Sequence, residues 1–145
     1  MRKMKLFLIL FVFTIFAGCS NKEVTRYWHD YKGESDLWEV YYHEKSVVTF
    51  WTEDGTLQHD TSTEANFTAV YKNGIDELAK VRQLEIGYET SLFGSSLLEN
   101  YNESGPDRRA FTITSSSGLV ANEPETIKAT LRIDDHTEII ELTRK

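Results

Sequence analysis

The sequence is poor in several residue types, and each shortage excludes a kind of fold or chemistry. Among 145 residues there are two prolines, four histidines and one cysteine, Cys19. One cysteine cannot form a disulfide within the chain, and it excludes zinc sites built from several thiolates. The histidines show neither the His-x-x-x-His nor the His-Glu-x-x-His spacing, although residues distant in sequence can still meet across strands. We therefore expect no metal and no cofactor.

Basic residues are also scarce, because 16 Lys and Arg face 23 Asp and Glu and the formal net charge is −7. Proteins that bind nucleic acid need a basic face, so this balance predicts no nucleic-acid partner. It also argues against a domain that lies flat on an anionic leaflet, where basic residues supply the attraction.

The only long apolar run lies at the start of the chain. Three basic residues, Arg2, Lys3 and Lys5, precede an apolar stretch over residues 6–16 in which Thr14 is the only polar residue. As a helix this stretch would span roughly 17–20 Å at about 1.5 Å per residue, which is short of a hydrocarbon core of about 30 Å. The layout predicts an export signal and argues against a transmembrane helix.

The end of this signal explains the lone cysteine. Phe16-Ala17-Gly18-Cys19 resembles the lipobox of bacterial lipoproteins, with an apolar residue, two small residues and then cysteine. The resemblance implies that the Cys19 thiol receives a diacylglyceryl group and that a peptidase cuts between Gly18 and Cys19. Further acylation, for example with palmitate, belongs to the same processing. Two or more acyl chains on one residue provide stable anchoring, whereas a single chain does not.

Lipidation at Cys19 divides the chain into three parts. Residues 1–18 would be the discarded signal peptide, residues 19–30 the lipidated cysteine with a tether or first edge segment, and residues 31–145 one domain. The expected location is the extracytoplasmic face of the cell membrane. Tyr27, Trp28 and Tyr31 lie near the tether, where they would either sit among lipid headgroups or begin the first strand.

The rest of the sequence alternates between apolar and polar residues, which is typical of half-buried strands. The alternating segments are residues 38–42, 67–71, 84–88, 111–113 and 127–133, and turn signals such as Asp54-Gly55, Asn73-Gly74 and Asp134-Asp135 lie between strands. This spacing predicts an all-β protein, an antiparallel β-sandwich of seven to nine strands, of which an immunoglobulin-like topology is one form. Residues 75–81 predict a short helical crossover between the sheets.

A second motif lies where the mature domain begins. Gly33-Glu34-Ser35, two residues and then Trp38 resemble a group of small lipoproteins from low-GC Gram-positive bacteria, as do Asp54-Gly55, the Tyr-Lys-x-Gly stretch at 71–74 and the strand at 84–89. The resemblance implies a fold and a location but no reaction. Ser35 lacks the second glycine of a Gly-x-Ser-x-Gly nucleophile elbow. We expect Gly33 and Ser35 to shape the strand entry and Trp38 to anchor the core.

The best candidate for a binding element is residues 91–106, which are long for a connection and rich in apolar side chains. The candidate ligand-binding residues are Phe93, Leu97, Leu98 and Tyr101. In the alternative interpretation residues 97–101 form another strand and bury these side chains. The functional expectation is a non-catalytic binding module, not an enzyme, whose partner is an envelope protein, a glycan or a small ligand. An envelope enzyme or inhibitor with a site built from loops is the alternative.

Overall fold

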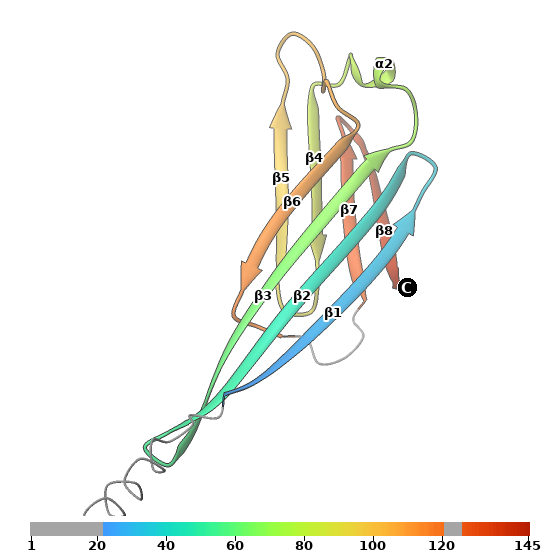
Figure 1. Cartoon of the computed structure of the whole chain (residues 1–145). Helices are drawn as coiled ribbons and strands as arrows, with labels where there is room; N and C mark the ends of the chain where they lie inside the picture. Colours follow the sequence, from blue (N-terminus) through green and yellow to red (C-terminus); the bar gives the residue numbers. More distant parts are fainter. Residues whose placement is uncertain (1–21, 121–125) are drawn as a thin grey trace, which may run out of the picture.

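The computed structural model describes residues 22–120 and 126–145. Nearly all of the regular structure in these residues is strand (Figure 1). The elements are β1 (Glu23–Glu34), β2 (Trp38–Glu53), β3 (Thr56–Tyr71), α2 (Ile75–Leu78), β4 (Gln83–Glu89), β5 (Gly94–Asn100), β6 (Ala110–Ser117), β7 (Ile127–Ile133) and β8 (His136–Arg144). The predicted all-β, antiparallel fold is confirmed, and the short helix is a crossover as expected. Among the described residues, no helix has the length and apolar character needed to cross a membrane.

Two tight turns determine the hairpins that the sequence signals. Asp54 and Gly55 connect β2 to β3 with φ angles of 50° and 75°, and Asp134 begins the β7–β8 turn with a φ of 49°. Left-handed φ values at the centre of a two-residue turn match the twist of antiparallel strands, and Asp and Gly tolerate them best. The Asp-Gly pair therefore fixes the register of the two 16-residue strands, from Glu53 opposite Thr56 to Trp38 opposite Tyr71.

The eight strands form one continuous order, β5-β4-β7-β8-β1-β2-β3-β6, and every pairing is antiparallel. The joint between its halves is short, because β1 pairs with β8 only at Tyr31 and Lys32. The sheet bends there, so that β5-β4-β7-β8 lies behind β1-β2-β3-β6 and encloses a core in a nearly closed barrel (Figure 1). The Greek-key order of an immunoglobulin domain is not the order found, because β1, β2 and β3 stay neighbours as successive hairpins.

The core fills the space between the two layers and is dominated by aromatic side chains. Trp38 is 1% exposed and its ring lies 5.3 Å from that of Tyr71. Tyr88 comes from the other layer and lies 5.1 Å from Tyr42 and 5.2 Å from Phe67, measured between ring centroids. The buried cluster runs from residue 31 to residue 142. A chain that starts at residue 19 therefore contains every described strand and the whole core.

Three strands extend well beyond this barrel (Figure 1). β6 pairs with β3 only over residues 63–70, and β8 reaches β1 only at residues 31 and 32. The remaining parts of β1, β2 and β3, residues 23–30, 44–53 and 56–62, form a three-stranded ribbon that we call the arm. Within segment 19–30, strand therefore begins at Glu23, because each residue from there on pairs with β2.

Candidate functional site

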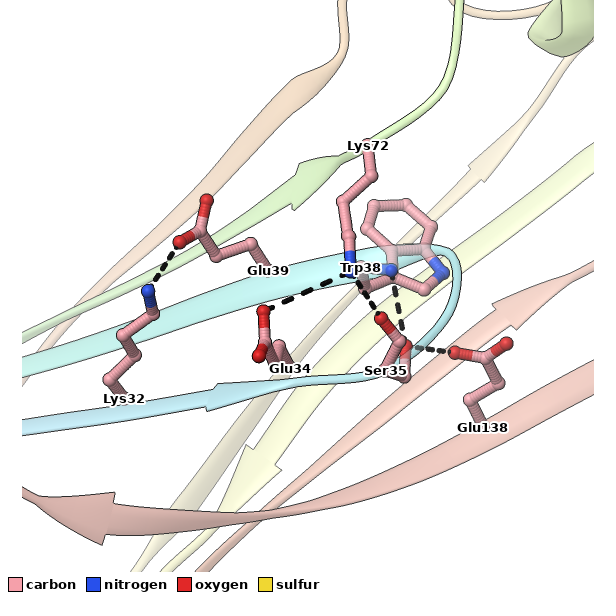
Figure 2. Close-up of polar contacts among 7 residues, drawn as sticks. All are labelled: Lys32, Glu34, Ser35, Trp38, Glu39, Lys72 and Glu138. Atoms are coloured by element: carbon pink, nitrogen blue, oxygen red, sulfur yellow. Dashed lines mark hydrogen bonds and ion pairs between the residues drawn. The ribbon is translucent and has the colours of Figure 1, made fainter.

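The Gly-Glu-Ser-x-x-Trp motif forms the turn between β1 and β2, and it is held by hydrogen bonds around Ser35 (Figure 2). The Ser35 Oγ accepts a hydrogen bond of 3.1 Å from the backbone N–H of Trp38 and donates one to Glu138 on β8. The Ser35 N–H returns a bond of 2.9 Å to the Trp38 carbonyl, and Lys72 donates one of 2.7 Å to the Ser35 carbonyl. The turn thereby fixes the start of β2, at which Trp38 enters the core.

The geometry around Ser35 differs from that of an activated nucleophile. A serine nucleophile gives its proton to an imidazole, which an acid then orients. Here the Ser35 hydroxyl donates to the Glu138 carboxylate, and His136 lies on the far side of that carboxylate, with its Nε2 3.1 Å from Oε1. The order is serine, acid, histidine, so the hydroxyl contacts a carboxylate and not the imidazole of a serine–histidine pair. The structural interpretation of the motif is confirmed.

Two ion pairs flank this turn on the surface (Figure 2). Lys32 Nζ lies 2.5 Å from Glu39 Oε1, and Lys72 Nζ lies 3.9 Å from Glu34 Oε2. The hydrogen bond between Lys32 and Glu39 raises the pKa of the lysine and lowers the pKa of the carboxyl. Exposed pairs of this kind contribute little to stability, so the polar support of the turn comes mainly from the hydrogen bonds of the Ser35 hydroxyl and backbone.

The prediction of a loop over residues 91–106 is wrong for the central part of this segment, because residues 94–100 form β5. β5 pairs with β4 from Glu89 opposite Gly94 to Gln83 opposite Asn100, which confirms the alternative interpretation as a strand. The strand divides the four candidate residues between two faces. Phe93, Leu97 and Tyr101 pack against the core, whereas Leu98 points outward and is 51% exposed.

A hollow lies on the outer face of the β5-β4-β7 layer and has a volume of about 570 Å³. Its floor is Gly87, which has Ser96 opposite it on β5 and Thr130 opposite it on β7. The absence of a side chain at Gly87 creates the depression, since a Cβ there would approach the Ser96 Cβ to 3.1 Å. Phe93, a residue singled out from the sequence, also lines the hollow. A glycine inside a strand often marks a close approach by a ligand or another backbone. Gly87 was therefore the sequence signal that could have indicated this hollow.

Charged pairs lie on either side of this floor. Arg132 donates two hydrogen bonds, of 3.0 Å and 2.7 Å, to the same oxygen of Glu85. Glu89 also lines the hollow and lies opposite Lys128 across the β4–β7 pairing. The hydroxyls of Ser96 and Thr130 therefore lie between two pairs of oppositely charged residues, Glu85 with Arg132 on one side and Glu89 with Lys128 on the other. Such a surface suits a ligand rich in hydroxyl or amide groups, which can exchange hydrogen bonds with both.

The core face of β2 contains one polar interruption that the alternation analysis missed. Glu44 is in phase with Trp38 and Tyr42, and it is only 4% exposed. Its carboxylate accepts a hydrogen bond of 2.8 Å from the Tyr42 hydroxyl, and its other oxygen lies 3.4 Å from the Ser46 Oγ. Glu44, four residues beyond Val40 in the same stripe, could have been recognised as an acid at a core position. It lies where the arm joins the barrel.

The neighbours of Glu44 extend this interruption into a polar cluster. Ser46 and Thr63 share a hydrogen bond of 2.8 Å, and Thr63 donates to the Leu119 carbonyl at 2.6 Å. His29 lies opposite Glu44 in the β1–β2 pairing, and both of its ring nitrogens are buried without a hydrogen-bond partner in the described structure. A carboxyl and an imidazole lose hydration when they are buried, so this cluster departs from what stability alone would select.

The histidines and carboxylates do not assemble a metal centre in the described part of the chain. No group of three or more His, Cys, Asp or Glu side chains there is close enough to hold a metal ion. Cys19 and Gly18, the predicted lipidation and cleavage positions, lie outside the described residues.

Comparison with known proteins identifies no relative, since no family model, no curated protein and no solved structure matches the chain. The fold and the site define the protein as an all-β domain with a bent, nearly closed antiparallel sheet, a projecting arm and an open hollow. Its function must be inferred from its own residues.

Proposed function

We propose that the protein is a lipoprotein, held on the extracytoplasmic face of the cell membrane by a lipid on Cys19, and that its β-domain binds a partner without catalysis. The observation that carries this proposal is the basic and apolar run that ends in Phe16-Ala17-Gly18-Cys19. Only Ser20, Asn21 and Lys22 separate Cys19 from Glu23, the first residue of β1. The folded domain thus starts almost at its anchor.

The hollow over Gly87 is the surface we assign to the partner. Hydroxyls from Ser96 and Thr130 and the carboxylates of Glu85 and Glu89 surround it, and Leu92, 41% exposed, adds an apolar edge. These groups match the surface of an envelope glycan, or of an extended protein segment that presents amides. Most of the lining belongs to strands rather than to loops, which favours a site that exists before the partner binds.

Photocrosslinking in living cells tests this proposal. A photoreactive amino acid at Ser96, in the lipidated protein, should give a discrete crosslinked product. The substitution Thr130→Phe, which fills the hollow from the facing strand, should remove that product. Thr114→Phe is the matched control, because Thr114 is an exposed strand threonine on β6 in the other layer.

The alternative function, an envelope enzyme or inhibitor, predicts a different result. If Ser96 gives no crosslinked product while purified residues 19–145 turn over an envelope substrate such as a glycan or peptide, the binding proposal fails. If the product forms equally with Thr130→Phe, the partner binds elsewhere and the hollow is not its site.

A further inference from the structure

The outer face of the arm combines tryptophan with basic side chains. The outward residues of β1 in this region are Val24, Arg26 and Trp28, and Lys22 directly precedes the strand. Their neighbours on β2 include Lys45, Val47 and Trp51. We call these seven residues the tryptophan face. Trp28 is 54% exposed, Val24 is 41% exposed, and Lys22 Nζ lies 5.9 Å from the centre of the Trp51 ring.

Acidic residues border this face but do not occupy it. Asp30 lies at its barrel end and is bound to His43 at 2.5 Å, while Glu53 near the tip accepts a hydrogen bond from the Trp51 indole at 3.4 Å. Asp60 and Glu64 lie on β3, the third strand of the arm, opposite Thr49 and Lys45. The Lys and Arg residues of the arm, Arg26 and Lys45, and Lys22 beside it therefore all lie on the tryptophan face, with the acidic side chains around them, in a chain whose net charge is −7.

We propose that the tryptophan face lies against the lipid headgroups of an anionic membrane surface, next to the lipid on Cys19. The proposal rests on the lipid anchor of the proposed function. Cys19 and Lys22 are three residues apart, so at most about 10 Å of extended chain separates the anchor from the start of the face. The anchor thus keeps this part of the arm beside the headgroups, whatever the orientation of the barrel.

The residues of the face suit that position. Tryptophan is enriched at membrane interfaces, because its ring is apolar and its N–H polar, and each Lys or Arg near an anionic leaflet gains roughly 1 kcal/mol. Ionic screening acts over about 8 Å at physiological salt, so the negative charge of the barrel at the other end of the arm counts for less, whereas Glu53 and Asp60 on the arm are close enough to oppose the attraction. The proposal places only the arm on the leaflet, and it is compatible with the expectation from net charge that the whole domain does not lie flat there.

A chemically attached lipid allows this inference to be tested independently of whether Cys19 is lipidated in the cell. Cys19 is the only cysteine, so residues 19–145 can be coupled through it to a maleimide lipid in vesicles of phosphatidylglycerol or of phosphatidylcholine. Lipids brominated near the headgroup then quench tryptophans that touch the membrane. Trp28→Phe identifies the contribution of Trp28, and the buried Trp38 provides an internal reference.

We expect strong quenching of Trp28 on phosphatidylglycerol, weak quenching on phosphatidylcholine, and reduction by high salt. Arg26→Glu with Lys45→Glu should lower the ratio of docked to undocked arm at least about 25-fold, or about fivefold for each cation removed. Lys80→Glu, a single charge reversal at an exposed position beyond α2, should leave quenching unchanged and is the matched control for Arg26→Glu or Lys45→Glu alone.

Two results would overturn the proposal. One is the absence of quenching on phosphatidylglycerol, and the other is quenching that the Arg26 and Lys45 changes do not reduce. Because the anchor is chemical, either result would leave the proposed lipidation of Cys19 untouched, and a failure of lipidation in cells would not alter the vesicle result.

Discussion

Gly105 packs directly against the backbone of Leu78, the last residue of α2. A Cβ at position 105 would overlap the Leu78 carbonyl oxygen and lie 2.9 Å from its carbonyl carbon, and the Gly105 N–H donates a bond of 2.9 Å to the Ala79 carbonyl. Leu78 is fully buried and closes the end of the core. This contact therefore holds the connection between β5 and β6 on the helical crossover.

Gly105→Ala should consequently destabilise the fold. The added Cβ would meet backbone atoms of Leu78, which cannot move aside as the flexible end of a side chain can. We expect a loss of about 1–3 kcal/mol in the free energy of unfolding, measured by urea denaturation. Gly74→Ala is the control, since nothing lies within 4 Å of a Cβ there, and it should change stability by less than about 0.5 kcal/mol. Equal stability of the two variants would contradict the packing described.

The hydroxyl of Ser35 should matter for stability and not for chemistry. Ser35→Ala removes the acceptor for the Trp38 N–H and the donor to Glu138, so we expect a loss of about 1–3 kcal/mol, partly restored in Ser35→Thr. Binding of the partner, monitored by the Ser96 crosslink, should persist in the folded variant. A variant of unchanged stability that had lost its function would instead indicate a reactive hydroxyl.

The buried carboxylate of Glu44 offers a test of the polar cluster. Glu44→Gln keeps the size of the side chain and an oxygen for the Tyr42 hydroxyl while it replaces the buried carboxyl by a neutral amide. We expect a stability equal to the natural protein or higher by up to about 1 kcal/mol. Glu44→Ala leaves a cavity and unpaired hydroxyls, and should lose about 2–3 kcal/mol. A large loss in Glu44→Gln, seen by urea denaturation at pH 7, would show that the charge itself stabilises the fold.

Tyr101 should make the fold sensitive to alkali. Burial, together with a hydrogen bond to Glu99, raises the pKa of Tyr101 to about 12, against about 10 in an unfolded chain. The folded state thus keeps a proton that the unfolded state loses, and the free energy of unfolding falls as pH rises from about 10 to about 12. Burial raises the pKa of Tyr71 and Tyr88 in the same direction.

Absorbance of tyrosinate and unfolding followed over the same pH range measure this effect. Tyr101→Phe should flatten the decline in stability above pH 10, whereas Tyr27→Phe, which removes an exposed phenol on the arm, should retain it. A decline of the same slope in Tyr101→Phe would show that other groups dominate.

Local patterns were sufficient to predict much of this fold. Alternation located the buried stripes at Trp38–Tyr42 and Leu84–Tyr88, and Asp54-Gly55 located the longest hairpin, because both signals depend on neighbours in sequence. The contacts between distant segments were not predictable in this way. The short pairing of β1 with β8 at Tyr31 and Lys32 is one of them. It joins residues more than a hundred positions apart in the sequence.

The candidate site was less predictable for a related reason. Leu97 and Leu98 are adjacent in sequence, and only the register of β5 against β4 decides which faces the core. The hollow needs Ser96, Gly87 and Thr130 on three strands at once. The arm could not be foreseen because its length depends on where β6 and β8 stop pairing, whereas the strands themselves are continuous in pattern.

The anchor at Cys19 is the central claim, and the intact mass of the mature protein tests it most directly. Protein purified from its own membranes with a mild detergent should begin at Cys19 and carry the added mass of a diacylglyceryl group with its fatty acids, and Cys19→Ser should remain uncleaved and unlipidated. A mature protein that began at any other residue, or that began at Cys19 with no lipid mass, would contradict the account.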